Sequence, residues 1–172
     1  ELAKNSLPNL SNPDAEKILL ATADLLLKIN PKSSQDILIP LAKKKDITGI
    51  AALRLLAVQQ SLQAKNSALS PDEIAAQIQA HPLHTSDDEL LVADLRIFEK
   101  PEDKKNIITD LAASRYSAPT TDAIAFARWL NRRFDYQAAI DFIGKDRALS
   151  DVDWLLVYLD AHAGLDRWGD VF

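Results

Sequence analysis

The sequence predicts an all-α protein built from antiparallel pairs of helices. Apolar residues recur at intervals of three and four along most of the chain, the spacing that places side chains on one face of a helix. The chain has four glycines, and runs of β-branched residues are few. Two-helix units are expected to start at regular spacings of 40, 34 and 30 residues, near Asp46, Ser86, Thr120 and Ser150. These observations together predict about nine to ten helices.

The composition is that of a globular protein and argues against several functional classes. Of the 172 residues, 47% are hydrophobic and 26% are charged, so a packed core is expected. The formal net charge of −5 argues against a nucleic-acid binder, because such a protein gains affinity by neutralising phosphates. Cysteine is absent, which excludes disulfide bonds and thiolate zinc sites.

The longest apolar run, residues 47–58, is about a dozen residues long and carries Arg54. A membrane-spanning helix needs about 20 apolar residues, so this run predicts a buried helix and no membrane span. Because the chain starts at Glu1 and has no methionine, we expect it to be an internal fragment of a longer protein. The sequence does not identify the cellular compartment of the protein. A cytoplasmic location is slightly favoured, but the parent protein could be membrane-anchored or exported.

Capping residues followed by apolar stripes predict where the helices of the first half begin. Residues 1–11 show little periodicity and are expected to form a loose lead-in. Asn30-Pro31 ends the first helix, since the residue before a proline avoids the α region. Helix starts are predicted at Asn12, at Ser33 or Ser34, at Asp46, and at two capping boxes, Ser70 to Glu73 and Ser86 to Glu89.

The second half begins where Pro101 breaks one helix and starts another. Thr120 or Thr121 is expected to cap the next helix, whose apolar stripe comprises Ala123, Phe126, Ala127, Leu130 and Phe134. Residues 134–136 leave room only for a tight turn, so the following helix must fold back antiparallel.

Residues 150–153 are expected to cap a last helix that repeats this stripe. Its apolar residues follow those of the earlier stripe by 29 positions, and they are Val152, Leu155, Leu156, Leu159 and Ala163. Trp168, however, follows Tyr136 by 32 positions. The two offsets together predict about one extra turn in the later helix.

The residues around the predicted turn resemble the tetratricopeptide repeat family, whose units are about 34 residues long. In that family the first helix carries a large and then a small apolar residue, matched here by Phe126-Ala127, and an apolar residue three positions later, matched by Leu130. The turn ends in an aromatic residue, matched by Tyr136, and a small residue follows three positions later, matched by Ala139. Ile143 takes the place of the large apolar residue in the second helix. Phe134 departs from the pattern, because the family usually has glycine there. The resemblance implies a right-handed α-α superhelix, or solenoid, forming one repeat domain over residues 12–172. Diverged helix pairs would cover 12–84, and repeat-like units 86–116, 120–147 and 150–172.

The same resemblance implies a site for a protein or peptide on the concave face of the repeats. Carried onto the best-matched unit, the groove-lining positions are Thr121, Ile124, Arg128 and Asn131, with Arg132 beside them. Arg128 and Arg132 are four residues apart, so both guanidinium groups face one side of a helix and could hold an acidic peptide or a C-terminal carboxylate. The alternative for these residues is an ordinary solvated face.

Catalytic motifs are missing from the sequence, and no enzyme activity, cofactor or metal is expected. His81 and His84, with Asp87 and Asp88 nearby, are the one cluster of metal-ligand residue types, but Pro82 interrupts any helical spacing between the histidines. We interpret this cluster as an interhelix loop. The sequence therefore predicts a non-catalytic scaffold for protein interaction, and the alternative is a purely structural packing domain within a larger protein.

Overall fold

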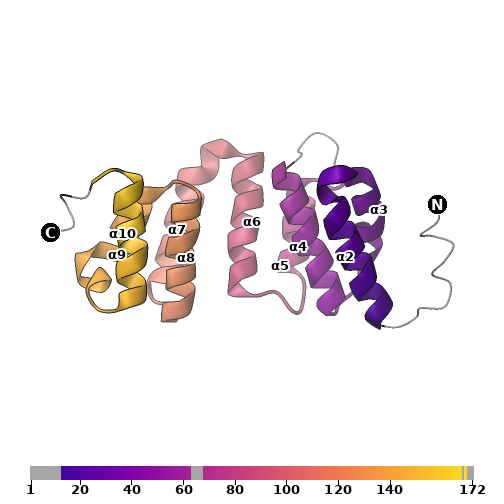
Figure 1. Ribbon diagram of the computed structural model, residues 1–172, viewed down its shortest axis with the longest axis horizontal. Helices are drawn as coiled ribbons and strands as arrows, with labels where there is room; N and C mark the ends of the chain where they lie inside the picture. The colour runs from indigo at the N-terminus through magenta and orange to yellow at the C-terminus, as the bar shows by residue number, and fades with distance from the viewer. Residues whose placement is uncertain (1–12, 63–67, 168, 170–172) are drawn as a thin grey trace. The chain divides into compact units, whose positions relative to one another are not determined.

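The computed structural model describes residues 13–62, 68–167 and 169, and this part of the chain is all-α (Figure 1). It contains nine α-helices and one short 3-10 helix, and no strand is present among the described residues, which confirms the predicted fold class. The predicted lead-in and the cap Asn12 lie outside the described residues. The helices are α2 (Pro13–Ile29), α3 (Pro31–Ala42), α4 (Ile47–Leu62), α5 (Pro71–Gln79), α6 (Ser86–Glu99), η2 (Pro101–Asp103), α7 (Lys104–Tyr116), α8 (Thr120–Arg132), α9 (Tyr136–Ala148) and α10 (Val152–Gly164).

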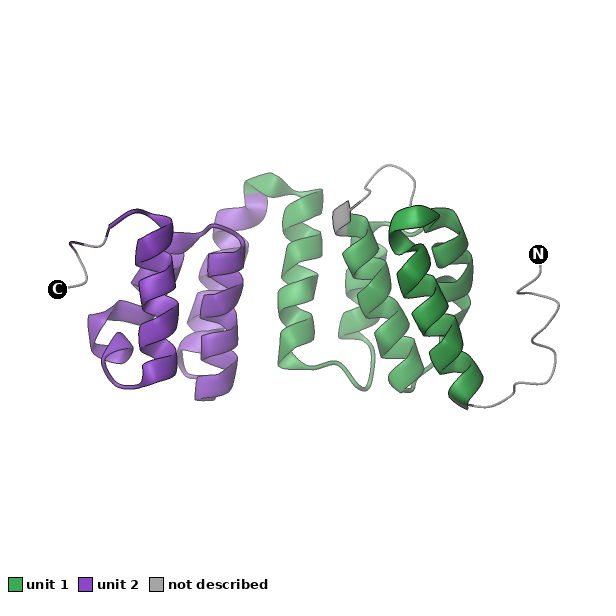
Figure 2. Cartoon of the chain, viewed as in Figure 1, with its two compact units in different colours: residues 1–102 green, residues 103–172 purple. Residues whose placement is uncertain are grey.

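The chain divides into two compact units, Glu1–Glu102 and Asp103–Phe172 (Figure 2). Unit 1 holds α2 to α6, and unit 2 holds α7 to α10. The boundary falls at η2, inside the predicted helix pair 86–116. Whether the two units belong to a single repeat domain stays a prediction.

Several helix ends lie where the sequence predicts them. Ser70 and Glu73 form the capping box of α5, in which Ser70 N donates to Glu73 Oε2 at 2.8 Å and Glu73 N donates to Ser70 Oγ at 3.2 Å. The Glu73 carboxylate accepts from Ser70 N and also from Ser70 Oγ at 3.0 Å, and these two hydrogen bonds, the backbone one first, lower its pKa. Asp46 starts α4 by accepting from the N–H groups of Thr48 and Gly49.

Other predicted caps were wrong by one to three residues. The second helix begins at Pro31 and is capped by Asn30, whose Oδ1 accepts from Ser33 N at 3.2 Å. Ser34 is instead buried inside this helix, where its hydroxyl donates to the carbonyl oxygen of Ala23 in α2 at 2.8 Å. Proline at the first helical position needs no N–H partner, so the cap moves back to the residue before it.

The caps of α6 and α8 also differ from the prediction. Thr85 and Asp88 form the box at the start of α6, one residue before the predicted one. Neither Thr120 nor Thr121 caps α8, because the residue before its first turn is Pro119. The cap of α10 lies within the predicted residues 150–153: Asp151 accepts from Asp153 N at 2.8 Å.

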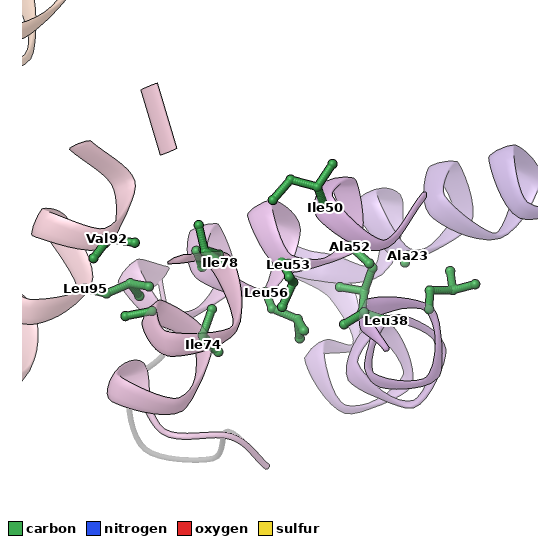
Figure 3. Close-up of a cluster of buried hydrophobic side chains, with 14 of the residues drawn as sticks. Ala23, Leu38, Ile50, Ala52, Leu53, Leu56, Ile74, Ile78, Val92 and Leu95 are labelled. Atoms are coloured by element: carbon green, nitrogen blue, oxygen red, sulfur yellow. The ribbon is translucent and has the colours of Figure 1, made fainter. Parts of the chain in front are cut away.

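The core of unit 1 is centred on α4, which contacts α2, α3, α5 and α6. As expected for a helix that is apolar on all sides, buried side chains leave α4 in several directions (Figure 3). Its buried members are Ile50, Ala52, Leu53, Leu56 and Ala57. They pack with buried side chains from the four other helices, among them Ala23, Leu38, Ile74, Ile78 and Val92.

A buried ion pair joins α4 to the start of α6. Arg54 Nε lies 2.6 Å from Asp88 Oδ1, and Arg54 Nη2 lies 2.8 Å from Asp88 Oδ2, a bidentate arrangement. The Asp88 side chain is 3% exposed, whereas that of Arg54 is 39% exposed. Burial alone would raise the pKa of the Asp88 carboxyl, but hydrogen bonds from Arg54 and Thr85 outweigh it and lower that pKa.

Unit 2 is built around the contacts among α8, α9 and α10, with α7 packed on α8. Phe126 of α8 is fully buried, and its ring centroid lies 4.9 Å from that of Phe142 in α9, edge to face. Tyr136 of α9 lies so close to Gly164 of α10 that a Cβ there would clash with the tyrosine ring. The antiparallel return predicted after residues 134–136 is consistent with these contacts between α8 and α9.

The helices α8 and α10 are related by an offset of 32 residues. Both contain 13 residues, so the extra turn predicted for the later helix is wrong. Both end in the same motif: Asp135 N donates to Leu130 O at 3.0 Å, and Arg167 N donates to His162 O at 3.0 Å. The residue before each donor is left-handed, with φ of 63° at Phe134 and 55° at Asp166.

Phe134 was wrongly assigned to the buried stripe of α8. Its side chain is 78% exposed, because the left-handed backbone of the turn directs it away from the core. Glycine favours this conformation, and Phe134 adopts it here without that freedom.

Candidate functional site

The five predicted groove residues lie on α8 and divide into two groups. Thr121, Arg128 and Arg132 are exposed, whereas Ile124 is buried and Asn131 is half-buried. Ile124, Arg128 and Asn131 are spaced i, i+4 and i+7, so they share one side of the helix.

This side of α8 is turned towards α10. Asn131 Nδ2 donates to the carbonyl oxygen of Val157 in α10 at 2.9 Å, and its buried Oδ1 has no hydrogen-bond partner among the described atoms. Arg128 Nη2 lies 3.3 Å from Asp153 Oδ1, in the first turn of α10. Positions 128 and 131 therefore meet positions 153 and 157 in order, so the two helices run parallel. Ile124 and Asn131 serve this packing, which leaves Thr121 and the two arginines for a ligand.

The ion pair of Arg128 is open to solvent. The Arg128 and Asp153 side chains are 53% and 57% exposed. Exposed pairs of this kind contribute about 0–1 kcal/mol, so the carboxylate of a ligand can replace that of Asp153 at little cost. Arg132 lies one turn further along α8, exposed and within reach of the same ligand.

A contact of this type recurs in the chain and was missed by sequence reasoning. A side chain on one helix meets the first turn of the helix two positions later: Glu16 with Thr48, Arg54 with Asp88, and Arg128 with Asp153. The partners are 32, 34 and 25 residues apart, and only helix pairing brings them together. These are the polar links between α2 and α4, α4 and α6, and α8 and α10.

The histidine cluster has structural contacts of its own. His81 is buried, its Nδ1 accepts from Leu83 N at 3.1 Å, and its Nε2 lies 3.1 Å from the carbonyl oxygen of Lys44. Nε2 must therefore carry the proton and donate, which ties the loop after α5 to the start of α4. Asp88 is held by Arg54. Within the described residues, no three His, Cys, Asp or Glu side chains are grouped so as to hold a metal ion.

A cluster of aromatic rings around Arg147 is a second feature that the sequence did not reveal. The guanidinium carbon lies 4.3 Å, 5.1 Å and 5.4 Å from the ring centroids of Tyr116, Trp154 and Phe142. Gly144, with φ of 67°, breaks the regular course of α9 before this arginine. The arrangement links α7, α9 and α10 through cation-π contacts.

Comparison of the chain with protein-family models, curated proteins and solved structures gives no significant match. None of the described helices is long and apolar enough to cross a membrane. A functional assignment therefore depends on the arrangement of the side chains themselves.

Proposed function

We propose that this chain is a non-catalytic scaffold of stacked helix pairs that binds an acidic peptide or protein segment on the face of α8. The observation that carries the proposal is the pair of exposed arginines, Arg128 and Arg132, which are one turn apart on α8, with Arg128 beside the first turn of α10. Their planar guanidinium groups can each bind a carboxylate with two hydrogen bonds.

The contacts within each unit favour a stacked, repeat-like arrangement. In unit 1, α4 contacts the helices before and after it as well as α2 and α6, and in unit 2 the helices α8, α9 and α10 contact one another. The recurrent links and the shared 32-residue offset of α8 and α10 fit a repeating unit that stacks on its neighbours. A tetratricopeptide-like superhelix is the arrangement that we propose on these grounds.

Binding of a labelled acidic peptide tests the proposal. A fluorescein-labelled hexaglutamate with a free C-terminus is expected to bind the protein and to lose affinity several-fold with Arg128→Glu and with Arg132→Glu. Lys145→Glu is the matched control, because it makes the same charge change at an exposed position of α9. The chain's net charge of −5 gives no general attraction to this peptide.

The control also defines the contrary result. Equal loss of affinity in all three variants would mean that only overall charge matters, and absence of binding would remove the site. An amidated form of the peptide shows whether the terminal carboxylate contributes.

A purely structural packing role is the second candidate, and an exposed apolar stripe on α2 favours it. Ile18, Leu25 and Ile29 are spaced i, i+7 and i+11 and are 52%, 72% and 81% exposed. Such a stripe is suited to burial against another helix. The arginine variants distinguish the two candidate functions. A purely structural role predicts that Arg128→Glu changes the binding of no other molecule.

A further inference from the structure

We propose that the outer side of α10 is a docking surface for a helix of another protein, and that this helix carries a lysine or arginine in its first turn. The surface, called here the α10 stripe, consists of Val152 and Leu156 of α10, with Leu149 in the turn before the helix. Val152 and Leu156 are one helical turn apart, and the three residues are 65%, 53% and 68% exposed in that order.

The parallel packing of α8 and α10 provides the geometry for the occupant. Arg128 and Asn131 of α8 contact α10. With the offset of 32 residues, Val152 and Leu156 correspond to Thr120, which is exposed, and Ile124, which is 7% exposed. A helix that packed on α10 as α10 packs on α8 would lie along the side of α10 that carries Leu156 and Asp160.

Charge then selects the kind of helix. Arg128 of α8 meets Asp153 in the first turn of α10. The residue of α10 that corresponds to Arg128 is Asp160, so the sign is reversed at the new interface. A docking helix must therefore present a cation where α10 presents Asp153. Because Asp160 is exposed, this charge also directs the approach of a basic helix.

The same charge argues against a second copy of this chain as the occupant. Docked in this geometry, a second copy of α10 would place its own Asp153 beside Asp160, and like charges would oppose the contact. The inference does not depend on the carboxylate site of α8, because it uses other residues.

Two peptides that differ at one residue test the inference. Both have the sequence of residues 150–166, and one of them carries Asp153→Lys. The lysine peptide is expected to bind the full chain about fivefold more tightly than the native one, as a reversed surface charge pair allows. Asp160→Arg in the protein gives α10 the charge that α8 has at Arg128. The native peptide should then bind more tightly than the lysine peptide.

Controls locate the contact on the α10 stripe. Leu156→Glu should abolish binding of both peptides while circular dichroism shows an unchanged helix content, since this side chain is already exposed. The hexaglutamate assay of the same variant separates a failure here from a failure of the α8 site. Equal affinity for both peptides, no binding of either, or an unchanged preference in Asp160→Arg would overturn the proposal. So would a dimer in sedimentation velocity that Leu156→Glu dissociates, because it would assign the surface to a second copy.

Discussion

Replacing Asp88 by asparagine removes one charge from the ion pair that joins α4 to α6. The substitution keeps the size of the side chain and one acceptor oxygen, so packing and part of the capping of Thr85 survive. Arg54 keeps its charge and loses its bidentate partner. Unit 1 is therefore expected to lose stability.

The size of the loss follows from the burial of the two partners. Breaking a fully buried ion pair costs about 3–5 kcal/mol, because an unpaired charge is left inside the protein. Asp88 is buried, but the Arg54 side chain is 39% exposed and can regain water, so the loss should fall at or just below the lower end of that range. We expect a loss of about 2–3 kcal/mol at neutral pH. With a urea m-value of about 1–3 kcal/mol/M, the midpoint should fall by about 1–3 M.

Urea unfolding with two probes measures this effect. All three tryptophans lie in the sequence of unit 2, at positions 129, 154 and 168, so their fluorescence follows unit 2, whereas circular dichroism follows both units. Asp72→Asn is the matched control, because Asp72 lies in the first turn of α5 and its 4.0 Å pair with Lys100 is more than half exposed. That control should change the free energy of unfolding by less than about 0.5 kcal/mol. Equal shifts in the two variants would refute the reasoning.

The pH dependence of the loss provides a second check. The pKa of Asp88 is lower in the folded chain than in the unfolded one, so the unfolded state binds the proton more tightly. Its stabilisation is complete above the unfolded pKa, which is about 4, and is lost as the pH falls below that value and through the lowered folded pKa. Asp88→Asn should accordingly flatten the acid side of the stability profile. An unchanged slope would contradict this assignment.

Two further substitutions test the packing of each unit. Gly49→Ala would place a methyl group 2.8 Å from the carbonyl carbon of Lys44 and 3.2 Å from His81 Nε2. This crowding should lower the stability of unit 1 by about 1–3 kcal/mol, despite the better helix propensity of alanine. Urea unfolding followed by circular dichroism measures the change, and a gain in stability would contradict the prediction. Arg147→Met removes the cation from the three rings and should lower the stability of unit 2 by about 1–2 kcal/mol. Tryptophan fluorescence measures the latter, and Lys145→Met, exposed on the same helix, should leave it unchanged.

The sequence by itself determined the helices and several of their ends, because these depend on residues a few positions apart. The capping box of Ser70 and Glu73, the stop at Asn30-Pro31 and the break at Pro101 are all local hydrogen-bonding or steric effects. The cap of α3 at Asn30 is also a local effect, because proline occupies the first helical position after it. The burial of Ser34 against Ala23, by contrast, is a tertiary contact that the sequence did not indicate.

Only the tertiary structure decided which side chains of a helix face a neighbour and which remain for a ligand. Ile124 and Asn131 were predicted for the groove, but they lie against α10 or are buried, whereas Arg128 keeps an exposed guanidinium. Phe134 follows the apolar periodicity of α8, yet a left-handed turn exposes it. The links between Arg54 and Asp88 and between Arg147 and Tyr116 join residues 34 and 31 positions apart. The periodicity of apolar residues along one helix does not predict such contacts, because they arise only when different helices pack together and exclude the water between them.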